Sequence, residues 1–415
     1  MHRRRSFAIQ VGLVALAISA FAVPAVAQQA ATKTAKTTKA TKAAPAAAKP
    51  VSFDAKPQLA AYAQLAAESY AQAATESERL KRAVDEFLKT PSDAALNEAR
   101  AIWVNARPSW LRTLAFRFAQ GPVDVVDAKA GSPARRIDAW PIDDSSIDYV
   151  EANPTAGLIN DTKVALTRDE LIKRSLAEGR SGAVLGWHAV EFLLWGQDMA
   201  PYAPGQRAYT DFLAGQVNND RRRAYLKLAT DQLVDDLKAV AAAWDAKAKQ
   251  SYTARFLLLS QREALSNTLT GLARTAYAEI AGRAIATPLD SGDQRDESSD
   301  ASDTSDRDIS FALRGIRAVW TGEAPTGTQR AGFDQLVARV DPALAARVTA
   351  TLHRAENAVA AIEVPFDRTI TAPVDSAMRQ KAEAAITALR ALGTTLREAG
   401  TRLGATVQVE ATTAP

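Results

Sequence analysis

An imidazole and a carboxylate stand three residues apart within an apolar stretch near the middle of this chain. The stretch covers residues 186–196, and the ionisable pair is His188 and Glu191. On a helix, positions i and i+3 share a face, so the two side chains project together along a stripe that Val184 and Trp195 extend. Burying such a pair without partners is costly. The spacing therefore indicates a metal site, a proton-transfer site or a satisfied hydrogen-bond network.

The chain contains few other residues that could bind a metal at this site through nitrogen or sulfur. The chain has three histidines and no cysteine, and His2 lies in a leader segment described below. His353 stands on a polar helical face, where we expect it to be solvated. One imidazole with several carboxylates suits iron, manganese or zinc better than Cu(I). We predict one metal at His188 and Glu191, iron or else zinc, completed by carboxylates from elsewhere in the chain.

Two other interpretations of the pair stay open. In a metallopeptidase, Glu191 would act as general base on a metal-bound water. The chain has no His-Glu-x-x-His motif, so such an enzyme would have to recruit its ligands from distant segments. In a structural module, a neutral His188 would donate to the buried carboxylate and orient the core without binding anything.

Two further residues are candidates for the same site. Arg107 follows Trp103 by four positions, so both lie on one helical face. They could line a cleft as cofactor-binding residues, with Arg107 neutralising Glu191 or an anionic ligand. The alternative is a structural arginine stacked on a tryptophan. The segment 138–144, with three aspartates, could supply further carboxylates or form a fixed loop.

The elements that position these residues are predicted to be helical. Apolar residues recur at spacings of three and four, and no stretch shows the alternation of a β-strand. The predicted fold class is all-α. The helical segments are residues 59–88, 93–118, 168–176, 223–246, 253–285, 309–320, 329–362 and 376–403. Ser92 and Thr167 are predicted helix caps, and residues 121–161, 198–220 and 287–308 are long enough to be functional loops.

The first fifty residues are predicted to lie outside the folded part. Residues 1–27 have the basic, apolar and small-residue regions of a cleaved signal peptide, and residues 28–50 read as a flexible linker of Ala, Thr, Lys and Pro. A periplasmic or secreted protein is expected, and the absence of cysteine excludes a lipoprotein anchor. Eight basic residues of this segment belong to the net charge of +4, which leaves −4 for residues 51–415. A nucleic-acid partner is not predicted.

The residues also resemble a known family. Gly186-Trp187-His188-Ala189-Val190-Glu191 matches the GxHxxE signature of imelysin-like proteins. Further segments look like that family's acidic loop, the helix behind it and its N-terminal helices: Gln294, Asp296-Glu297, Ser299, Ser302-Asp303, Arg307-Asp308-Ile309, Gly315-Ile316-Arg317, Trp103, Arg107, residues 116–118 and residues 138–141. The resemblance covers roughly residues 57 to 400.

The resemblance implies two pseudo-symmetric helical-bundle halves, here residues 51–220 and 221–405, with a site at their interface. Residues 406–415 are expected to form a disordered tail. Within the acidic loop, Ser302-Asp303 keeps the family's pattern, so Asp303 is the predicted third metal ligand beside His188 and Glu191. Many relatives carry His, Cys and Phe in this loop, whereas this chain has Ser298, Asp300 and Ala301.

The resemblance also implies a role in iron acquisition, as in the related EfeO-type iron-uptake proteins. The expected ligand is a metal ion or an iron-containing compound, which a membrane transport partner in the cell envelope would receive. The family's peptidase classification comes from an insulin-cleaving member, which keeps the metallopeptidase alternative open.

Overall fold

A computed structural model describes residues 52–118, 121–177, 179–200 and 202–410. The predicted signal peptide and linker lie outside the described residues. The all-α prediction is confirmed: among the described residues the only β-type pairings are isolated bridges. No helix in this part of the chain combines the length and apolar character of a membrane span.

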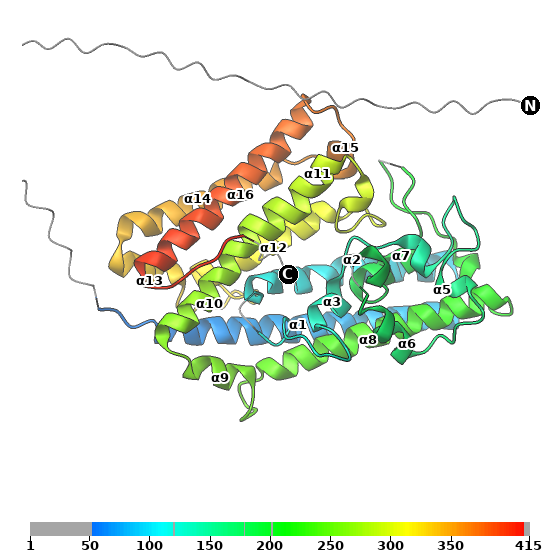
Figure 1. The fold of residues 1–415 in the computed structure, drawn as a ribbon, viewed down its shortest axis with the longest axis horizontal. Coiled ribbons are helices and arrows are strands. Elements are labelled where there is room, and N and C mark those ends of the chain that lie inside the picture. The colour runs from blue at the N-terminus through cyan, green and yellow to red at the C-terminus, as the bar shows by residue number, and fades with distance from the viewer. Residues whose placement is uncertain (1–51, 119–120, 178, 201, 411–415) are drawn as a thin grey trace, which may run out of the picture. The chain divides into compact units, whose positions relative to one another are not determined.

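The helices follow one another along the chain (Figure 1). In order they are α1 (Lys56–Lys89), α2 (Asp93–Leu111), η1 (Arg112–Phe116), α3 (Pro133–Asp138), α4 (Asp144–Ile147), α5 (Gly157–Asn160), α6 (Arg168–Arg174), η2 (Arg180–Gly182), α7 (Gly186–Trp195), η3 (Tyr209–Phe212), α8 (Val217–Trp244), α9 (Tyr252–Leu258), α10 (Gln261–Arg274), η4 (Thr275–Ala286), α11 (Thr287–Ser291), η5 (Gln294–Asp296), α12 (Ser305–Thr321), α13 (Phe333–Val340), α14 (Pro342–Ala360), α15 (Asp367–Ile370) and α16 (Ala377–Arg402).

The first bundle contains α1, α2, α7 and α8. Helix α1 buries apolar residues at helical spacing and packs against both α2 and α8. Rings from these helices meet in one cluster, in which Tyr70 stacks on Trp244 of α8 with centroids 6.1 Å apart. Because α8 packs on α1 and α9 contacts both helices, the first bundle continues through α9, whereas α10 packs mainly on α16.

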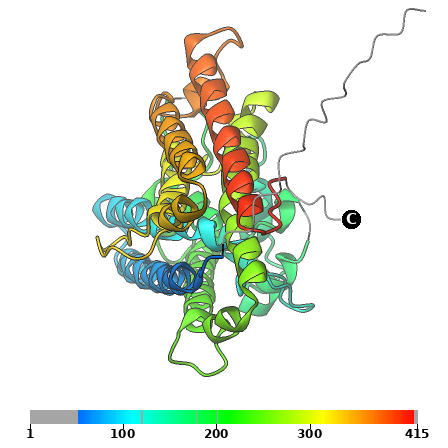
Figure 2. The same cartoon turned by 90° about the vertical axis from the view of Figure 1, so that its left-hand side faces the viewer.

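The second bundle contains α10, the π-helical segment η4, α12, α13, α14 and α16. Figure 2 shows α14 and α16, in orange and red, above α1 in blue. Two helices expected to be continuous are broken. Ser260 caps α10 by accepting from Glu263 N at 3.2 Å, and Asp341 caps α14 by accepting from Leu344 N at 2.9 Å. In each case a polar side chain satisfies a helix terminus and starts a new helix.

Other local predictions can be compared directly. Ser92 and Thr167 cap α2 and α6 as predicted. The disordered tail is wrong for residues 406–410: Val407 and Val409 are buried, and the backbone N–H of Thr406 donates to Ser266 Oγ at 2.9 Å. Alternate apolar residues pack this segment onto α10, and its polar composition concealed that pattern.

The two bundles meet where α12 packs against α2 and η1. Gly315 of α12 makes this approach possible, because a Cβ there would clash with the backbone carbonyl of Arg112. Helices α2, α7 and α12 therefore converge, and the long loops before and after α7 and before α12 lie around their ends (Figure 1).

Candidate functional site

Helix α7 begins in tight contact with the end of α3. Gly186, its first residue, has φ +86°, and a Cβ at this position would clash with the carbonyl oxygens of Arg136 and Ile137. Only glycine fits both conditions. This close approach places His188, two residues later, beside Asp138 at the end of α3.

The predicted pair forms as the helical spacing requires. His188 Nδ1 lies 2.8 Å from Glu191 Oε2, and each residue is 2% exposed. The other carboxylate oxygen, Oε1, accepts from the backbone N–H of Ser302 at 3.0 Å and from its hydroxyl at 2.6 Å. The acidic loop thus folds over α7, and each carboxylate oxygen of Glu191 has a partner.

An arginine closes the other side of the imidazole. Arg107 Nη2 lies 3.0 Å from His188 Nε2 and 2.8 Å from Asp308 Oδ2, and its Nη1 pairs with Asp138. Asp138 Oδ1 also lies 3.2 Å from His188 Nε2. A neutral ring accepts from Arg107, whereas a protonated ring donates to Asp138. Ser299 Oγ completes the set by donating to Asp308 at 2.9 Å.

The electrostatics follow from these contacts. Burial raises the pKa of Asp138, but the Arg107 guanidinium and the His188 contact outweigh burial and hold this pKa well below its usual range. For His188, burial and Arg107 oppose protonation, yet the hydrogen bonds to Asp138 and Glu191 prevail and raise its pKa. Carboxylates on both sides thus compensate the positive charge at this site.

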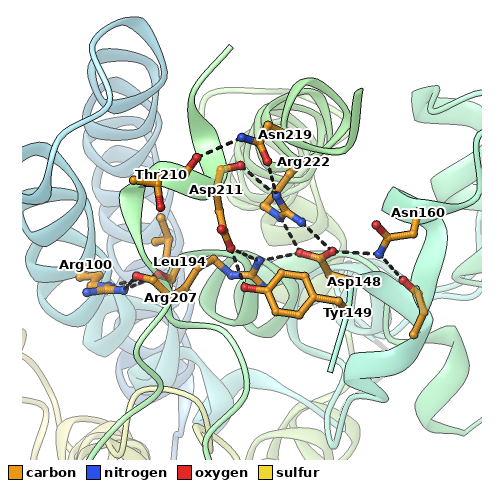
Figure 3. Close-up of polar contacts among 11 residues, drawn as sticks. Arg100, Asp148, Tyr149, Asn160, Leu194, Arg207, Thr210, Asp211, Asn219 and Arg222 are labelled. Atoms are coloured by element: carbon orange, nitrogen blue, oxygen red, sulfur yellow. Dashed lines mark hydrogen bonds and ion pairs between the residues drawn. The ribbon is translucent and has the colours of Figure 1, made fainter. Parts of the chain in front are cut away.

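A second polar network fixes the C-terminal end of α7 (Figure 3). Arg100 Nη2 donates to the Leu194 carbonyl at 2.9 Å and to the Arg207 carbonyl at 2.7 Å. Arg207 in turn pairs with the fully buried Asp148 at 2.6 Å, and Arg222 pairs with the same carboxylate at 2.6 Å. Carbonyls that the helix leaves unsatisfied are thereby bound, and the helix carrying the pair is held at both ends.

The pair lies at the wall of a cleft of about 840 Å³. Carboxylates dominate its charged lining: Asp143, Asp144, Glu191, Glu297 and Asp300, with Arg180 and Arg295 as the cations. Burial and nearby carboxylates raise the pKa of Asp144 to about 7 and the pKa of Asp300 well above its ordinary value. Such shifts indicate an excess of negative charge that a cation could neutralise.

The structure separates the other predicted site residues. Trp103 is fully buried, its ring packs edge-on against Trp195 at 5.4 Å, and its Nε1 donates to the Trp187 carbonyl. Arg107 contacts His188 and stacks over Trp187 rather than Trp103. Neither residue lines the large cleft. His353 is exposed, as expected.

Asp303 is close to the pair but belongs to a different group. Its neighbour Ser302 binds Glu191, whereas the Asp303 carboxylate lies with those of Asp198 and Asp367. A single-residue offset along the loop decides this, because successive residues in an irregular segment point in different directions. Asp138 contacts His188 and Ser302 binds Glu191, whereas Asp308 acts through Arg107. All three lie in the predicted loops, where no local pattern distinguishes them from their acidic and hydroxyl neighbours.

Comparison with known proteins now decides the family. The family model Imelysin (peptidase M75) matches residues 66–396, which includes the pair, the acidic loop and both bundles. The chain belongs to the imelysin family. Iron-regulated protein A of Synechococcus elongatus is 22% identical over 334 residues, which cover 79% of this chain and 81% of that protein.

Two solved structures share the imelysin fold. An imelysin-like protein from Psychrobacter arcticum has a TM-score of 0.60 at 18% identity, over 86% of this chain and 99% of that one. A crystal structure described as an iron-regulated protein A precursor, from Parabacteroides distasonis, has a TM-score of 0.66 at 18% identity, over 85% of this chain and 97% of that one. The fold prediction is thereby confirmed on independent structures.

Proposed function

We propose that this imelysin-family protein binds iron as cargo in the acidic cleft, with His188 and Glu191 as its first ligands, and serves iron acquisition in the cell envelope. The main support for this proposal is that His188 Nδ1 lies 2.8 Å from Glu191 Oε2 at the wall of that cleft. Metal bonds of about 2.1 Å at right angles separate neighbouring ligands by roughly 3 Å. A metal ion can therefore replace the proton between these two atoms without moving α7.

The rest of the site suits a cation at this place. The Arg107 contact occupies Nε2, so Nδ1 is the nitrogen available for a metal. Asp144 and Asp300 line the same cleft and offer additional oxygen ligands. The mixture of one imidazole and several carboxylates favours iron, with zinc as the competing ion. The name of the Synechococcus relative, an iron-regulated protein, supports the same assignment.

The proposed location follows from the predicted signal peptide. An envelope protein that binds iron as cargo must release it, and a membrane transport protein is the expected recipient. The peptidase alternative has weaker support. A general base needs a free oxygen to take a proton from water, whereas Oε1 of Glu191 accepts two hydrogen bonds from Ser302 and the proposal above uses Oε2 as a metal ligand.

Binding of Fe²⁺ under anaerobic conditions tests the proposal, with His188→Ala and Glu191→Gln beside the wild type. His353→Ala is the matched control, because it removes an exposed imidazole. We expect one equivalent of iron in the wild type and the control, and at least about tenfold weaker binding in the two site variants. Circular dichroism establishes that each variant is folded.

Two outcomes would overturn the proposal. One is a wild type that binds no Fe²⁺ at micromolar concentration, and the other is folded site variants that bind as tightly as the wild type. A parallel titration with Zn²⁺ identifies the preferred metal. Cleavage of an unfolded protein substrate by the loaded wild type, lost in Glu191→Gln, would replace the cargo role with the peptidase one.

A further inference from the structure

A second group of carboxylates lies beside the cleft but outside its lining. Asp198 follows the end of α7, Asp303 lies in the acidic loop and Asp367 is the first residue of α15. One carboxylate oxygen from each residue comes within 4.8 Å of the other two. None of the three residues lines the large cleft. Three segments far apart in sequence therefore bring their negative charges to one point.

Asp367 distinguishes this group from an ordinary acidic surface. Its side chain is 0% exposed, and neither carboxylate oxygen has a hydrogen-bond partner. Asp303 Oδ1 is likewise buried and unpartnered. Within the described part of the chain, no lysine or arginine forms an ion pair with any of the three aspartates. A fully buried carboxylate with no partner is costly, so a cation or a proton must compensate it.

The surroundings hold the group in place. Asp198 accepts from the backbone N–H of Ala200 at 3.0 Å and from Gln294 Nε2 at 2.6 Å, so its carboxylate is oriented before any ligand arrives. Glu297, 1% exposed, also has two unpartnered oxygens, and burial together with the neighbouring Asp367 raises its pKa well above its ordinary value. Asp303 is only half-buried, which leaves an approach from solvent on its side.

We propose that Asp198, Asp303 and Asp367 form a second cation site, which binds a hard, oxygen-preferring divalent ion such as Ca²⁺. The donor set contains only oxygen, which such ions prefer, and it has neither imidazole nor thiolate. Bonds of about 2.4 Å place oxygens on opposite sides of a Ca²⁺ ion roughly 5 Å apart, so the observed spacing fits one ion. This site is independent of the iron-binding function proposed above.

The position gives the bound ion a structural task. It would join the end of α7, the acidic loop and α15. Ser302, which holds Glu191, directly precedes Asp303. A cation at Asp303 would therefore order the loop that covers the pair, and it would join α15, which contacts α16, to the segment that follows α7.

Calorimetric titration with Ca²⁺ tests the site, using the wild type, Asp367→Asn and two controls. Asp290→Asn removes an equal charge from an exposed position on α11, and Glu191→Gln removes the charge from the proposed iron site while keeping an oxygen that can accept from Ser302. We expect one Ca²⁺ equivalent in the wild type and both controls, and about tenfold or weaker affinity in Asp367→Asn. If Ca²⁺ binds Glu191→Gln as tightly as the wild type, the Ca²⁺ site is distinct from the iron site.

Thermal unfolding supplies a second measurement. Without Ca²⁺, Asp367→Asn should unfold at the wild-type temperature or above, because it removes a repelling charge. With millimolar CaCl₂ the wild type should gain thermal stability and Asp367→Asn should not. The proposal is overturned if the wild type binds no Ca²⁺ at millimolar concentration, which would mean that shared protons compensate the cluster. It is equally overturned if Asp367→Asn binds Ca²⁺ like the wild type.

Discussion

Nη2 of Arg107 lies 3.0 Å from Nε2 of His188, so a permanent cation contacts the imidazole of the family signature. This contact is tolerable because Arg107 also pairs with two buried carboxylates, Asp138 and Asp308. The arginine thus has two functions. It supplies the positive charge that the two carboxylates need. Because it contacts Nε2 of His188, it also leaves Nδ1, on the side of Glu191, as the nitrogen that can bind a metal or a proton.

Replacing Arg107 with methionine should destabilise the protein by about 3–5 kcal/mol, because two buried carboxylates lose their cation. Methionine keeps most of the side-chain volume, so the loss reports the charge. The measurement is the free energy of unfolding in urea. Arg168→Met is the control, since Arg168 forms an exposed ion pair with Asp235 and its loss should cost under about 1 kcal/mol. Equal losses in the two variants would show that the Arg107 network contributes no more than a surface pair.

Gly186→Ala should destabilise the protein more than the same substitution at a positive-φ glycine that has room for a Cβ, such as Gly215. Gly186 has φ +86° and no room for a Cβ, whereas Gly215 has φ +94° with no atom within 4 Å of the Cβ position. Gly215→Ala therefore measures the conformational cost alone, about 1–2 kcal/mol. We expect Gly186→Ala to exceed it by at least about 1 kcal/mol, because α3 and α7 must separate. Urea unfolding of both variants checks this, and similar losses would mean that the two helices adjust freely.

The pKa of Asp144 predicts how stability depends on pH. The folded-state pKa is about 7, above its ordinary value in an unfolded chain, because burial and the neighbouring carboxylates Asp143 and Glu191 disfavour its charge. The folded state therefore keeps a proton that the unfolded state loses. Its contribution to stability is fully present below about pH 4 and is lost as pH rises to about 7.

Asp144→Asn, which mimics the neutral form, isolates this contribution from the other titrating carboxyls. Between pH 5 and pH 8, the metal-free wild type should lose roughly 2–3 kcal/mol more than the variant. Urea midpoints at the two pH values give the difference, with Asp290→Asn as the exposed control. Parallel pH profiles for wild type and Asp144→Asn would contradict the assigned shift.

How much of this molecule the sequence could predict depends on the range of the interaction. Helical periodicity placed His188 and Glu191 on one face, and the caps at Ser92 and Thr167 were visible because each depends on a few adjacent residues. The packing of α8 against α1 could not be predicted, because it depends on contacts between residues far apart in the chain. Apolar spacing shows that a helix has a buried face, but it does not identify the partner.

The candidate site shows the same limit at the level of single residues. Arg107 was selected for its position near Trp103, yet its partners Asp138 and Asp308 stand 31 and 201 positions away in the chain. Asp303 was selected from eight acidic residues, and the loop path turned its neighbour Ser302 toward Glu191 instead. Asp198 and Asp367 had no local signal, since an isolated aspartate close to a helix terminus is common on protein surfaces.

Asp148→Asn tests whether the network at the far end of α7 supports the site. The substitution keeps the shape of a fully buried side chain but removes the charge shared by Arg207 and Arg222. Buried Arg222 would lose its counter-ion and Arg207 would keep only the more distant Asp211, so we expect a loss of about 3–5 kcal/mol in urea unfolding. Asp211→Asn is the matched control: Asp211 pairs with the same Arg207 at 3.3 Å but its side chain is 25% exposed, so the substitution should cost about 1 kcal/mol.

The backbone N–H of Arg207 also binds the Trp195 carbonyl at 2.7 Å, and so freeing this arginine should loosen the last turn of α7. Hydrogen exchange should therefore speed up in α7 of Asp148→Asn and not in Asp211→Asn, and unchanged exchange in both would mean that α7 holds its position without the network.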